Sequence, residues 1–400
     1  MNARLDKSLD TESIHSSLDR WVHQDLIPSA ASVVFDGPTV VSEYFTGHQD
    51  REREKPVDRD SIFRLFSNTK LITSVAAMIL HEEGAFKLDD EAARYIPKLA
   101  DLRVLKEDAT DVHDTEPLES QITVRQLMSH TAGFSYGIFM DTPIDPLFRS
   151  KRVLHPGNDL EGLVEALATI PLLYQPGQKF HYSIATDVLG RLIEIWSGQS
   201  FGEFLASRIF NPLGMTNTSF YLSEHQRERL CVLYDGADPE NPYLPGLSIA
   251  SELAGDYFRP RALESGGGGL LGTISDYSKF WQLLIAGGTY DGVQLLQGKS
   301  LALMRTNQLP PGNVVEFRQW EMPNTVFGLG FALKQKPAVR EPPEAIDEYY
   351  WGGIAGTHSW IAPRANVGVL LFTQRLPGYW LPFFHEHKRA IYGMIRTSTR

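Results

Sequence analysis

Strand-like segments occur near the two ends of this chain and are sparse between them. These short hydrophobic and β-branched runs cover residues 31–36, 39–45, 62–65, 326–334, 348–351, 359–361 and 367–373. Gly37-Pro38 separates the first two runs, which is typical of a hairpin. Helical periodicity dominates from about residue 86 to 260. This distribution predicts an α+β fold in which both termini build one antiparallel sheet beside a mostly helical insertion.

The length of the chain also favours more than one domain. A chain of 400 residues usually exceeds a single hydrophobic core. We therefore predict a sheet-containing domain formed by residues 1–85 and 265–400, and a mostly helical domain formed by residues 86–264. The expected helices cover residues 11–26, 67–83, 124–129, 160–168, 183–196, 200–209, 275–286 and 382–396. Because ligands favour the seam between such units, we expect the active site there.

Ser67-Asn68-Thr69-Lys70 is the sole Ser-x-x-Lys in the sequence and opens a predicted helix. Residues i and i+3 of a helix share a face, with about 5–6 Å between their Cβ atoms. The amine of Lys70 can therefore reach the hydroxyl of Ser67, which pairs a nucleophile with a base. An N-cap serine followed by an exposed lysine is the structural alternative for this motif alone.

Two further segments carry groups suited to the same chemistry. Tyr182 stands at the start of the predicted helix 183–196, where its hydroxyl can face a cleft. Residues 351–358, Trp-Gly-Gly-Ile-Ala-Gly-Thr-His, lie between two strand patterns. Glycines at a strand edge allow a substrate to approach the backbone, and the N–H groups there can serve as oxyanion donors.

In this order, the three segments resemble the serine β-lactamase and penicillin-binding superfamily, in particular its class C-like esterase branch, the family VIII carboxylesterases. Residues 127–133, 209–215 and 267–273 are similar to segments of the same family, and the resemblance extends from about residue 12 to 395. It implies an α/β sandwich domain plus an all-α domain, as in class C β-lactamases.

The resemblance implies roles for individual residues. Ser67 matches the acylated nucleophile of the family, Lys70 its neighbouring base, and Tyr182 the tyrosine of its second motif. Trp351-Gly352-Gly353 matches the Lys-Thr-Gly motif, and the backbone N–H groups of Ser67 and Ile354 would form the oxyanion hole. Which of Lys70 and Tyr182 acts as the base stays open at this point.

Two departures from the family pattern point to the substrate. Ile184 stands where the lactamase branch has an asparagine whose amide hydrogen-bonds the substrate, and Trp351 replaces the lysine that faces the β-lactam carboxylate. The second change removes a charge-assisted contact of roughly 1.5–3 kcal/mol. Apolar and aromatic replacements suit an uncharged ester, so we predict a carboxylesterase-type serine hydrolase acting on small-molecule esters. An acyltransferase, a β-lactamase or D-amino-acid peptidase, and a non-catalytic binder of cell-wall fragments are the alternatives.

Other residues are candidates for the substrate pocket. Phe134 and Tyr136 follow the family-like segment 127–133, and His358 lies close to the third motif. Aromatic residues on the predicted strands suit either an acyl pocket or the core, and these are Tyr349, Tyr350, Trp360 and Trp380. Ser200, in a literal Gly-x-Ser-x-Gly, is interpreted as a helix cap, because the preceding segment reads as helix and Glu203 completes a capping box.

Composition excludes several partners. A net charge of −11 without a Lys/Arg cluster argues against nucleic acid. A single cysteine allows no intrachain disulfide, and no run approaches the ~20 apolar residues of a membrane span. Without a visible signal peptide the expected location is cytoplasmic. No metal and no organic cofactor are implied, and the sequence leaves the oligomeric state open.

Overall fold

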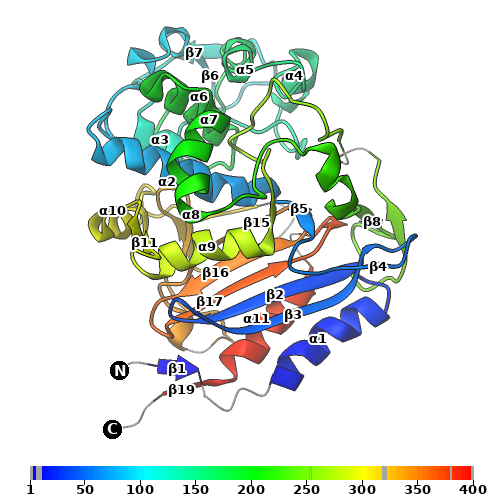
Figure 1. The fold of residues 1–400 in the computed structure, drawn as a ribbon. Coiled ribbons are helices and arrows are strands. Elements are labelled where there is room, and N and C mark those ends of the chain that lie inside the picture. Colours follow the sequence, from blue (N-terminus) through cyan, green and yellow to red (C-terminus); the bar gives the residue numbers. More distant parts are fainter. Residues whose placement is uncertain are drawn as a thin grey trace.

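An eight-stranded antiparallel sheet is the main element of the fold (Figure 1). The computed structural model describes residues 3–5, 11–251, 253, 255–317, 322–339, 341, 343–378 and 381–397. In sheet order the strands are β13 (Thr325–Phe327), β14 (Ala332–Lys334), β15 (Tyr349–Gly353), β16 (Thr357–Ala362), β17 (Val367–Phe372), β2 (Ser29–Asp36), β3 (Thr39–Asp50) and β4 (Lys55–Pro56). Because β17 pairs with β2, strands from both ends of the chain share one sheet. The predicted α+β fold is confirmed.

Helices cover both faces of this sheet, which explains why its central strands are hydrophobic throughout. β17 is buried along its whole length, as is β2 up to its last residue. Helices α1 (Thr11–His23) and α11 (Pro382–Tyr392) lie on one face, and α9 (Ile274–Ile285) lies on the other (Figure 1). α1 turns Ile14, Leu18 and Trp21 toward the sheet, a spacing that places all three on one side of a helix.

Three expectations about the strands and the last helix are wrong in detail. Residues 326–334 form a hairpin of β13 and β14 rather than one strand, because the chain reverses at Gly330, which has φ +94°. β5 (Ile62–Arg64) pairs with β10 (Leu271–Thr273) outside the main sheet. The C-terminal helix ends at Tyr392, and β19 (Ile395–Thr397) then pairs with β1 (Ala3–Leu5).

The helical part of the chain packs above α9 and contains more irregular structure than predicted. Its helices are α3 (Val124–Met128), α4 (Asp145–Ser150), α5 (Leu160–Leu167), α6 (Ala185–Ser197), α7 (Phe201–Leu205), η4 (Ala206–Phe210) and α8 (Asn211–Leu213), with short turns η2 (Ala92–Arg94), η3 (Pro97–Leu99) and η5 (Glu224–Arg229). Two strand pairs were not predicted, β6 (Arg103–Leu105) with β7 (Thr115–Pro117) and β8 (Tyr234–Gly236) with β9 (Leu247–Ile249). The proposed division into two domains stays a prediction.

Helix α2 (Thr69–Glu82) lies at the centre of the molecule. Its residues from Thr69 to Leu80 are all buried, and it packs against α6 of the helical part.

The other elements are short: β11 (Thr289–Tyr290), β12 (Val293–Gln294), α10 (Gly298–Met304), η6 (Pro343–Ala345) and β18 (Arg375–Leu376). Among the described residues, no helix is long and apolar enough to cross a bilayer.

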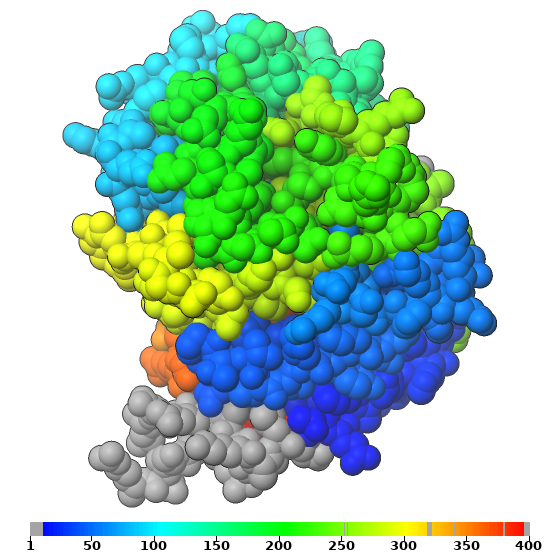
Figure 2. Space-filling model, viewed as in Figure 1, coloured from blue at the N-terminus to red at the C-terminus, as the bar shows by residue number. Residues whose placement is uncertain are grey.

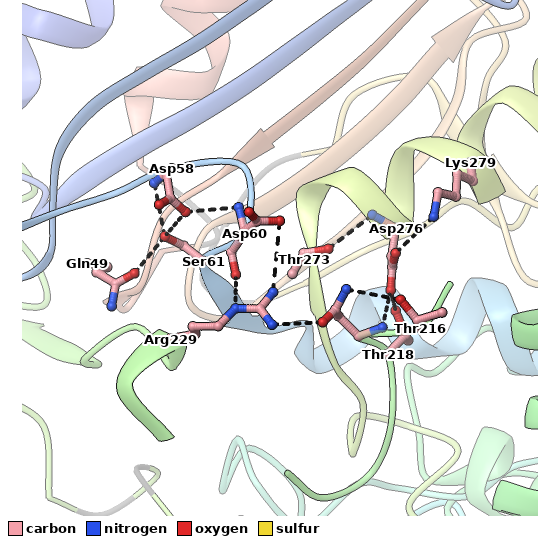
Figure 3. Close-up of polar contacts among 11 residues, drawn as sticks. Gln49, Asp58, Asp60, Ser61, Thr216, Thr218, Arg229, Thr273, Asp276 and Lys279 are labelled. Carbon is pink, nitrogen blue, oxygen red and sulfur yellow. Dashed lines mark hydrogen bonds and ion pairs between the residues drawn. The ribbon is translucent and has the colours of Figure 1, made fainter. Parts of the chain in front are cut away.

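Hydrogen bonds connect residues 217–229, after α8, to the sheet-containing part (Figure 3). Asp276, in the first turn of α9, accepts hydrogen bonds from the Asn217 backbone N–H at 2.6 Å and from the Thr218 hydroxyl at 3.1 Å. Arg229 donates to Asn217 Oδ1 and to the carbonyl oxygen of Asp60, each at 2.9 Å. The space-filling view shows the green surface of the helical part directly against the yellow-green to yellow surface of the segment that begins with α9 (Figure 2). The helical part is thus held in place over α9.

Candidate active site

Ser67 lies in a tight turn, η1 (Phe66–Asn68), that directly precedes α2. Phe66 has φ +44°, a left-handed conformation that costs a non-glycine residue on the order of 1–3 kcal/mol. Strand β15 packs closely on this turn, because a Cβ added to Gly353 would lie 3.1 Å from the Phe66 Cβ. A side chain at Gly353 would therefore separate the backbone of Ile354 from Ser67.

The buried Asn68 side chain anchors this turn to the sheet. Its amide Nδ2 donates to the Thr357 carbonyl oxygen at 3.0 Å, and its Oδ1 accepts from the Ser359 hydroxyl at 2.9 Å. The Tyr277 hydroxyl, from α9, donates to the Asn68 carbonyl oxygen at 3.1 Å. These bonds to β16 and α9 fix the residue next to Ser67 from two sides.

The Lys70 side chain is buried beside Ser67. Its Nζ lies 3.3 Å from Ser67 Oγ, 3.1 Å from Tyr136 Oη and 2.6 Å from the Gly267 carbonyl oxygen. Burial lowers the pKa of Lys70 to about 7, although the charge of Asp187 acts in the opposite direction. A substantial fraction of Lys70 is therefore an uncharged amine at neutral pH, as a base next to a serine requires.

The Tyr182 hydroxyl also faces Ser67. It donates to Ser67 Oγ at 2.8 Å, and Trp351 Nε1 donates to Tyr182 Oη at 3.4 Å. Burial raises the pKa of Tyr182 well above its usual value, so that the phenol stays protonated at neutral pH. Tyr182 can thus donate a proton to an oxygen bound near Ser67.

The segment that carries Tyr182 is held by main-chain contacts to residues 130–135. His181 N–H donates to the His130 carbonyl oxygen at 2.9 Å, and Ile184 N–H donates to the Ser135 carbonyl oxygen at 3.1 Å. The ring nitrogen Nδ1 of His130 accepts from the Ser183 N–H at 3.2 Å. Burial lowers the pKa of His130 well below its usual value, so the ring is neutral.

Aromatic rings surround the Tyr182 side chain. The ring centroids of Trp351, Phe317 and Phe139 lie 5.1, 5.4 and 6.2 Å from that of Tyr182. Phe139 belongs to the helical part and Phe317 precedes the β13–β14 hairpin, yet their rings are 6.3 Å apart. Both are only partly buried. We call these four residues the aromatic wall; it gives the site an apolar side.

Some of the predicted substrate-binding residues lie near Ser67 and others do not. Trp351 and Tyr136 reach the site, and Gly352 lies in β15 opposite His358. His358 itself points away from Ser67, because alternate residues of a strand face opposite sides of the sheet. Its neighbours Thr357 and Ser359 contact the Ser67 turn, whereas the His358 ring stacks on Phe384 at 4.0 Å. We therefore remove His358 from the proposed pocket.

The remaining pocket candidates belong to the hydrophobic core. The side chains of Phe134 and Ile184 are buried within it, as are Tyr349 and Trp360. Trp380 lies outside the described residues. Ser200 is a helix cap as interpreted, since its hydroxyl accepts from the Glu203 N–H at 3.3 Å.

The sequence did not indicate two groups that contact or face Lys70. The Gly267 carbonyl oxygen is its nearest polar neighbour, and the buried carboxylate of Asp187 holds the same loop. A carbonyl has no sequence signature. Asp187, however, is the one charged residue in the segment 185–190 at the start of α6, and a single acidic residue in such a segment is a usable signal for a buried charge.

Comparison with known proteins decides the family. A family model described as Beta-lactamase matches residues 18–391. The chain belongs to the beta-lactamase family. The predicted superfamily and fold are thereby confirmed, and the Ser-x-x-Lys motif at Ser67 is typical of this family.

Relatives of this beta-lactamase-family chain include two with esterase names. Esterase EstB of Burkholderia gladioli is 29% identical over 387 residues, 92% of each chain. Lovastatin esterase of Penicillium rubens is 33% identical over 340 residues, 78% of this chain and 79% of the relative. Protein Rv1367c of Mycobacterium tuberculosis is 30% identical over 360 residues, 88% and 87% of the two chains. The solved structure of EstCE1, a hydrolase with promiscuous acyltransferase activity, has a TM-score of 0.81 at 24% identity and covers 96% of this chain and 98% of its own.

Proposed function

We propose that this protein is a serine hydrolase that cleaves carboxylic esters through an acyl-enzyme on Ser67. The observation that carries the proposal is the convergence of Lys70 Nζ and Tyr182 Oη on Ser67 Oγ, at 3.3 and 2.8 Å. A nucleophile with a base and an acid within hydrogen-bond reach is the arrangement that acyl transfer needs. The esterase names of EstB and lovastatin esterase support the same reaction class.

In the first step Ser67 Oγ attacks the ester carbonyl carbon and its proton passes to neutral Lys70. The backbone N–H groups of Ser67 and Ile354 would stabilise the oxyanion that forms. As the bond to the leaving alcohol breaks, Tyr182 gives its proton to the alcohol oxygen and is reprotonated from Lys70. Water then attacks the acyl group by the reverse sequence of proton transfers, which releases the acid and restores Ser67.

The aromatic wall supports an uncharged substrate. Trp351 occupies the position where, by the resemblance, the lactamase branch carries a lysine for a carboxylate, and its side chain offers no charge. Phe139 and Phe317 are partly exposed beside Tyr182, where an apolar acyl group would bury them further. Short or medium-length acyl esters of uncharged alcohols are therefore the substrates we propose.

A series of nitrophenyl esters of increasing acyl length tests this function. Ser67→Ala should reduce kcat/KM by at least about a thousandfold, the scale expected for loss of a covalent nucleophile. Ser200→Ala is the matched control, because Ser200 lies in the other serine motif but caps α7. Ester hydrolysis that survives Ser67→Ala would overturn the proposal, and its loss in Ser200→Ala would assign it to the other serine motif.

Transfer of the acyl group to an alcohol is the second candidate. ML-236A carboxylate methylbutanoyltransferase of Penicillium citrinum is 33% identical over 174 residues, 43% of this chain. An apolar wall beside the acyl-enzyme favours an organic acceptor over water. Product analysis with and without an added alcohol separates the two reactions: a new ester in proportion to the alcohol indicates transfer, and acid alone indicates hydrolysis.

A further inference from the structure

We propose that Asp187 is a positioning residue for the base Lys70: its carboxylate holds the Gly267 carbonyl against the lysine amine and supplies the counter-charge for the protonated amine. The inference rests on the proposed function in that it takes Lys70 as the base. It adds a group from α6 that contacts neither Ser67 nor the expected substrate position, and it accounts for a buried charge that the proposed reaction does not use.

The Asp187 carboxylate is completely buried and binds the glycine loop between residues 264 and 270. Its Oδ1 accepts from the Ser265 hydroxyl at 2.5 Å and from the Gly267 N–H at 3.2 Å. The carbonyl oxygen of that same Gly267 accepts from Lys70 Nζ at 2.6 Å. One residue therefore connects the carboxylate to the amine, and a shift of Asp187 would move the acceptor nearest to Lys70.

The second carboxylate oxygen faces the same site. Asp187 Oδ2 is buried and has no hydrogen-bond partner among the described residues. A Cβ added to Gly267 would lie 2.3 Å from Asp187 Oδ2 and 2.8 Å from Tyr136 Oη, so both oxygens gather around one glycine. An unpaired carboxylate oxygen is costly inside a protein unless a nearby positive charge offsets it. Lys70 is the cation whose charge acts on this carboxylate.

The other titratable groups around Lys70 and Asp187 are neutral near pH 7. Tyr136 from the loop after α3 and Tyr182 before α6 have pKa values raised by burial, and the pKa of His130 is lowered by burial. Lys70 and Asp187 thus remain as the pair whose charges determine each other. Burial raises the pKa of Asp187, and the charge of Lys70 acts in the opposite direction; burial lowers the pKa of Lys70, and the charge of Asp187 opposes that effect.

Asp187→Asn tests the inference, because the amide keeps the shape and an oxygen acceptor but removes the charge. The readout is the pH dependence of kcat/KM for a nitrophenyl ester between about pH 5 and about pH 10. Without the carboxylate the amine loses its proton more easily, so the acid limb should move to lower pH by about one unit. A purely structural role would lower activity without moving the limb.

Glu264→Gln is the matched control. Glu264 is a partly buried carboxylate at the start of the same loop, with its pKa raised by burial, and it binds the Gly202 N–H rather than Gly267. Its neutralisation should leave the acid limb in place. An unchanged limb in an Asp187→Asn protein that melts as a folded protein would overturn the inference, as would an equal shift in both variants. Neither result would affect the proposed function, which fails on Ser67→Ala alone.

A measurement on the unmodified protein covers the case in which Asp187→Asn does not fold. Selective carbon-13 labelling of aspartate reports the ionisation of the Asp187 carboxyl, and nitrogen-15 labelling of lysine reports that of Lys70. The inference requires an ionised Asp187 throughout the pH interval in which Lys70 loses its proton. A carboxyl signal that stays protonated across this interval would overturn it, whatever the esterase activity.

Discussion

The side-chain nitrogen of Lys70 lies 2.6 Å from the carbonyl oxygen of Gly267. A carbonyl oxygen only accepts, so this contact takes one N–H of the amine, and Tyr136 Oη at 3.1 Å takes a second. A neutral amine has two N–H groups and one lone pair. With both N–H groups engaged, the lone pair is directed toward Ser67 Oγ, the remaining polar neighbour of Nζ among the described residues. The two acceptors therefore orient the proposed base.

Tyr136→Phe removes one of these acceptors and keeps the ring. The variant should lower kcat/KM by roughly tenfold, which corresponds to the loss of one hydrogen bond to the Lys70 amine. Steady-state kinetics on a nitrophenyl ester measures the loss. Tyr95→Phe is the control, since the Tyr95 hydroxyl binds Asp90 at 2.8 Å in the helical part, away from Ser67. Equal kinetics for the two variants would contradict the orienting role.

Gly267→Ala should damage the site more than any change of side-chain chemistry at this loop. Its Cβ would press on both Asp187 Oδ2 and Tyr136 Oη, and overpacking of this kind typically costs about 1–3 kcal/mol. We expect a lower urea midpoint and a loss of ester hydrolysis. Gly298→Ala, in the first turn of α10, would bring its Cβ only to ordinary van der Waals contact, 3.8 Å from the Gly287 carbonyl oxygen, and should be neutral. A Gly267→Ala enzyme with normal activity would contradict the packing described.

Stability should depend on pH through Lys70. The folded-state pKa is about 7, below the value of 10.5 expected for the unfolded chain. Below pH 7 both states bind the proton and the folded state bears the full cost of the buried charge. Between about 7 and about 10.5 the folded state holds the neutral amine, so this cost falls as the pH rises, and it is absent above both values.

Lys70→Met removes this cost along with activity. The variant should be more stable than the wild type at about pH 6, by at most roughly 5 kcal/mol, and the difference should shrink toward about pH 10. Urea unfolding at the two pH values measures it. A stability difference that grows with pH would show that the pKa of Lys70 is raised rather than lowered in the folded state.

Phe317→Ala should change which esters are preferred. Phe317 is part of the aromatic wall, 5.4 Å from the Tyr182 ring centroid, and its removal opens space beside Tyr182. Esters with longer acyl chains should gain in kcat/KM relative to the acetate ester. The gain should be at most roughly 1 kcal/mol of binding free energy for each additional methylene that the pocket buries. An unchanged chain-length profile would place the acyl group elsewhere.

The sequence predicts the reacting side chains of this site better than the backbone groups that hold them in place. The spacing of Ser67 and Lys70 predicts that these two side chains meet, because both belong to one local pattern, whereas the resemblance to the β-lactamase superfamily implied that Tyr182 joins them. The Gly267 carbonyl and the left-handed Phe66 were not predictable in this way, since backbone direction is set by tertiary packing. His358 was misplaced because its register within β16, and so the sheet face it occupies, depends on pairing with β15.

The same distinction holds for the fold. The pairing of β17 with β2 follows from hydrophobic runs at both ends of the chain. The apolar run 326–334 predicts one strand, although Gly328 and Gly330 interrupt it. Periodicity alone does not show whether such glycines mark a bulge within a strand or a turn between two strands, as they do here. The strands of the short pairs in the helical part are three residues long, below the length at which a periodic pattern can be recognised.

Mass spectrometry of an acid-quenched reaction tests the central claim most directly. A slowly deacylating ester is mixed with the wild-type protein and with Ser67→Ala, and the intact mass and its peptides are determined. We predict that the wild-type protein gains the mass of one acyl group, on the peptide that contains Ser67, and that the variant gains none. An adduct on another residue, or turnover without any adduct at the shortest quench times and at saturating ester, would contradict an acyl-enzyme on Ser67.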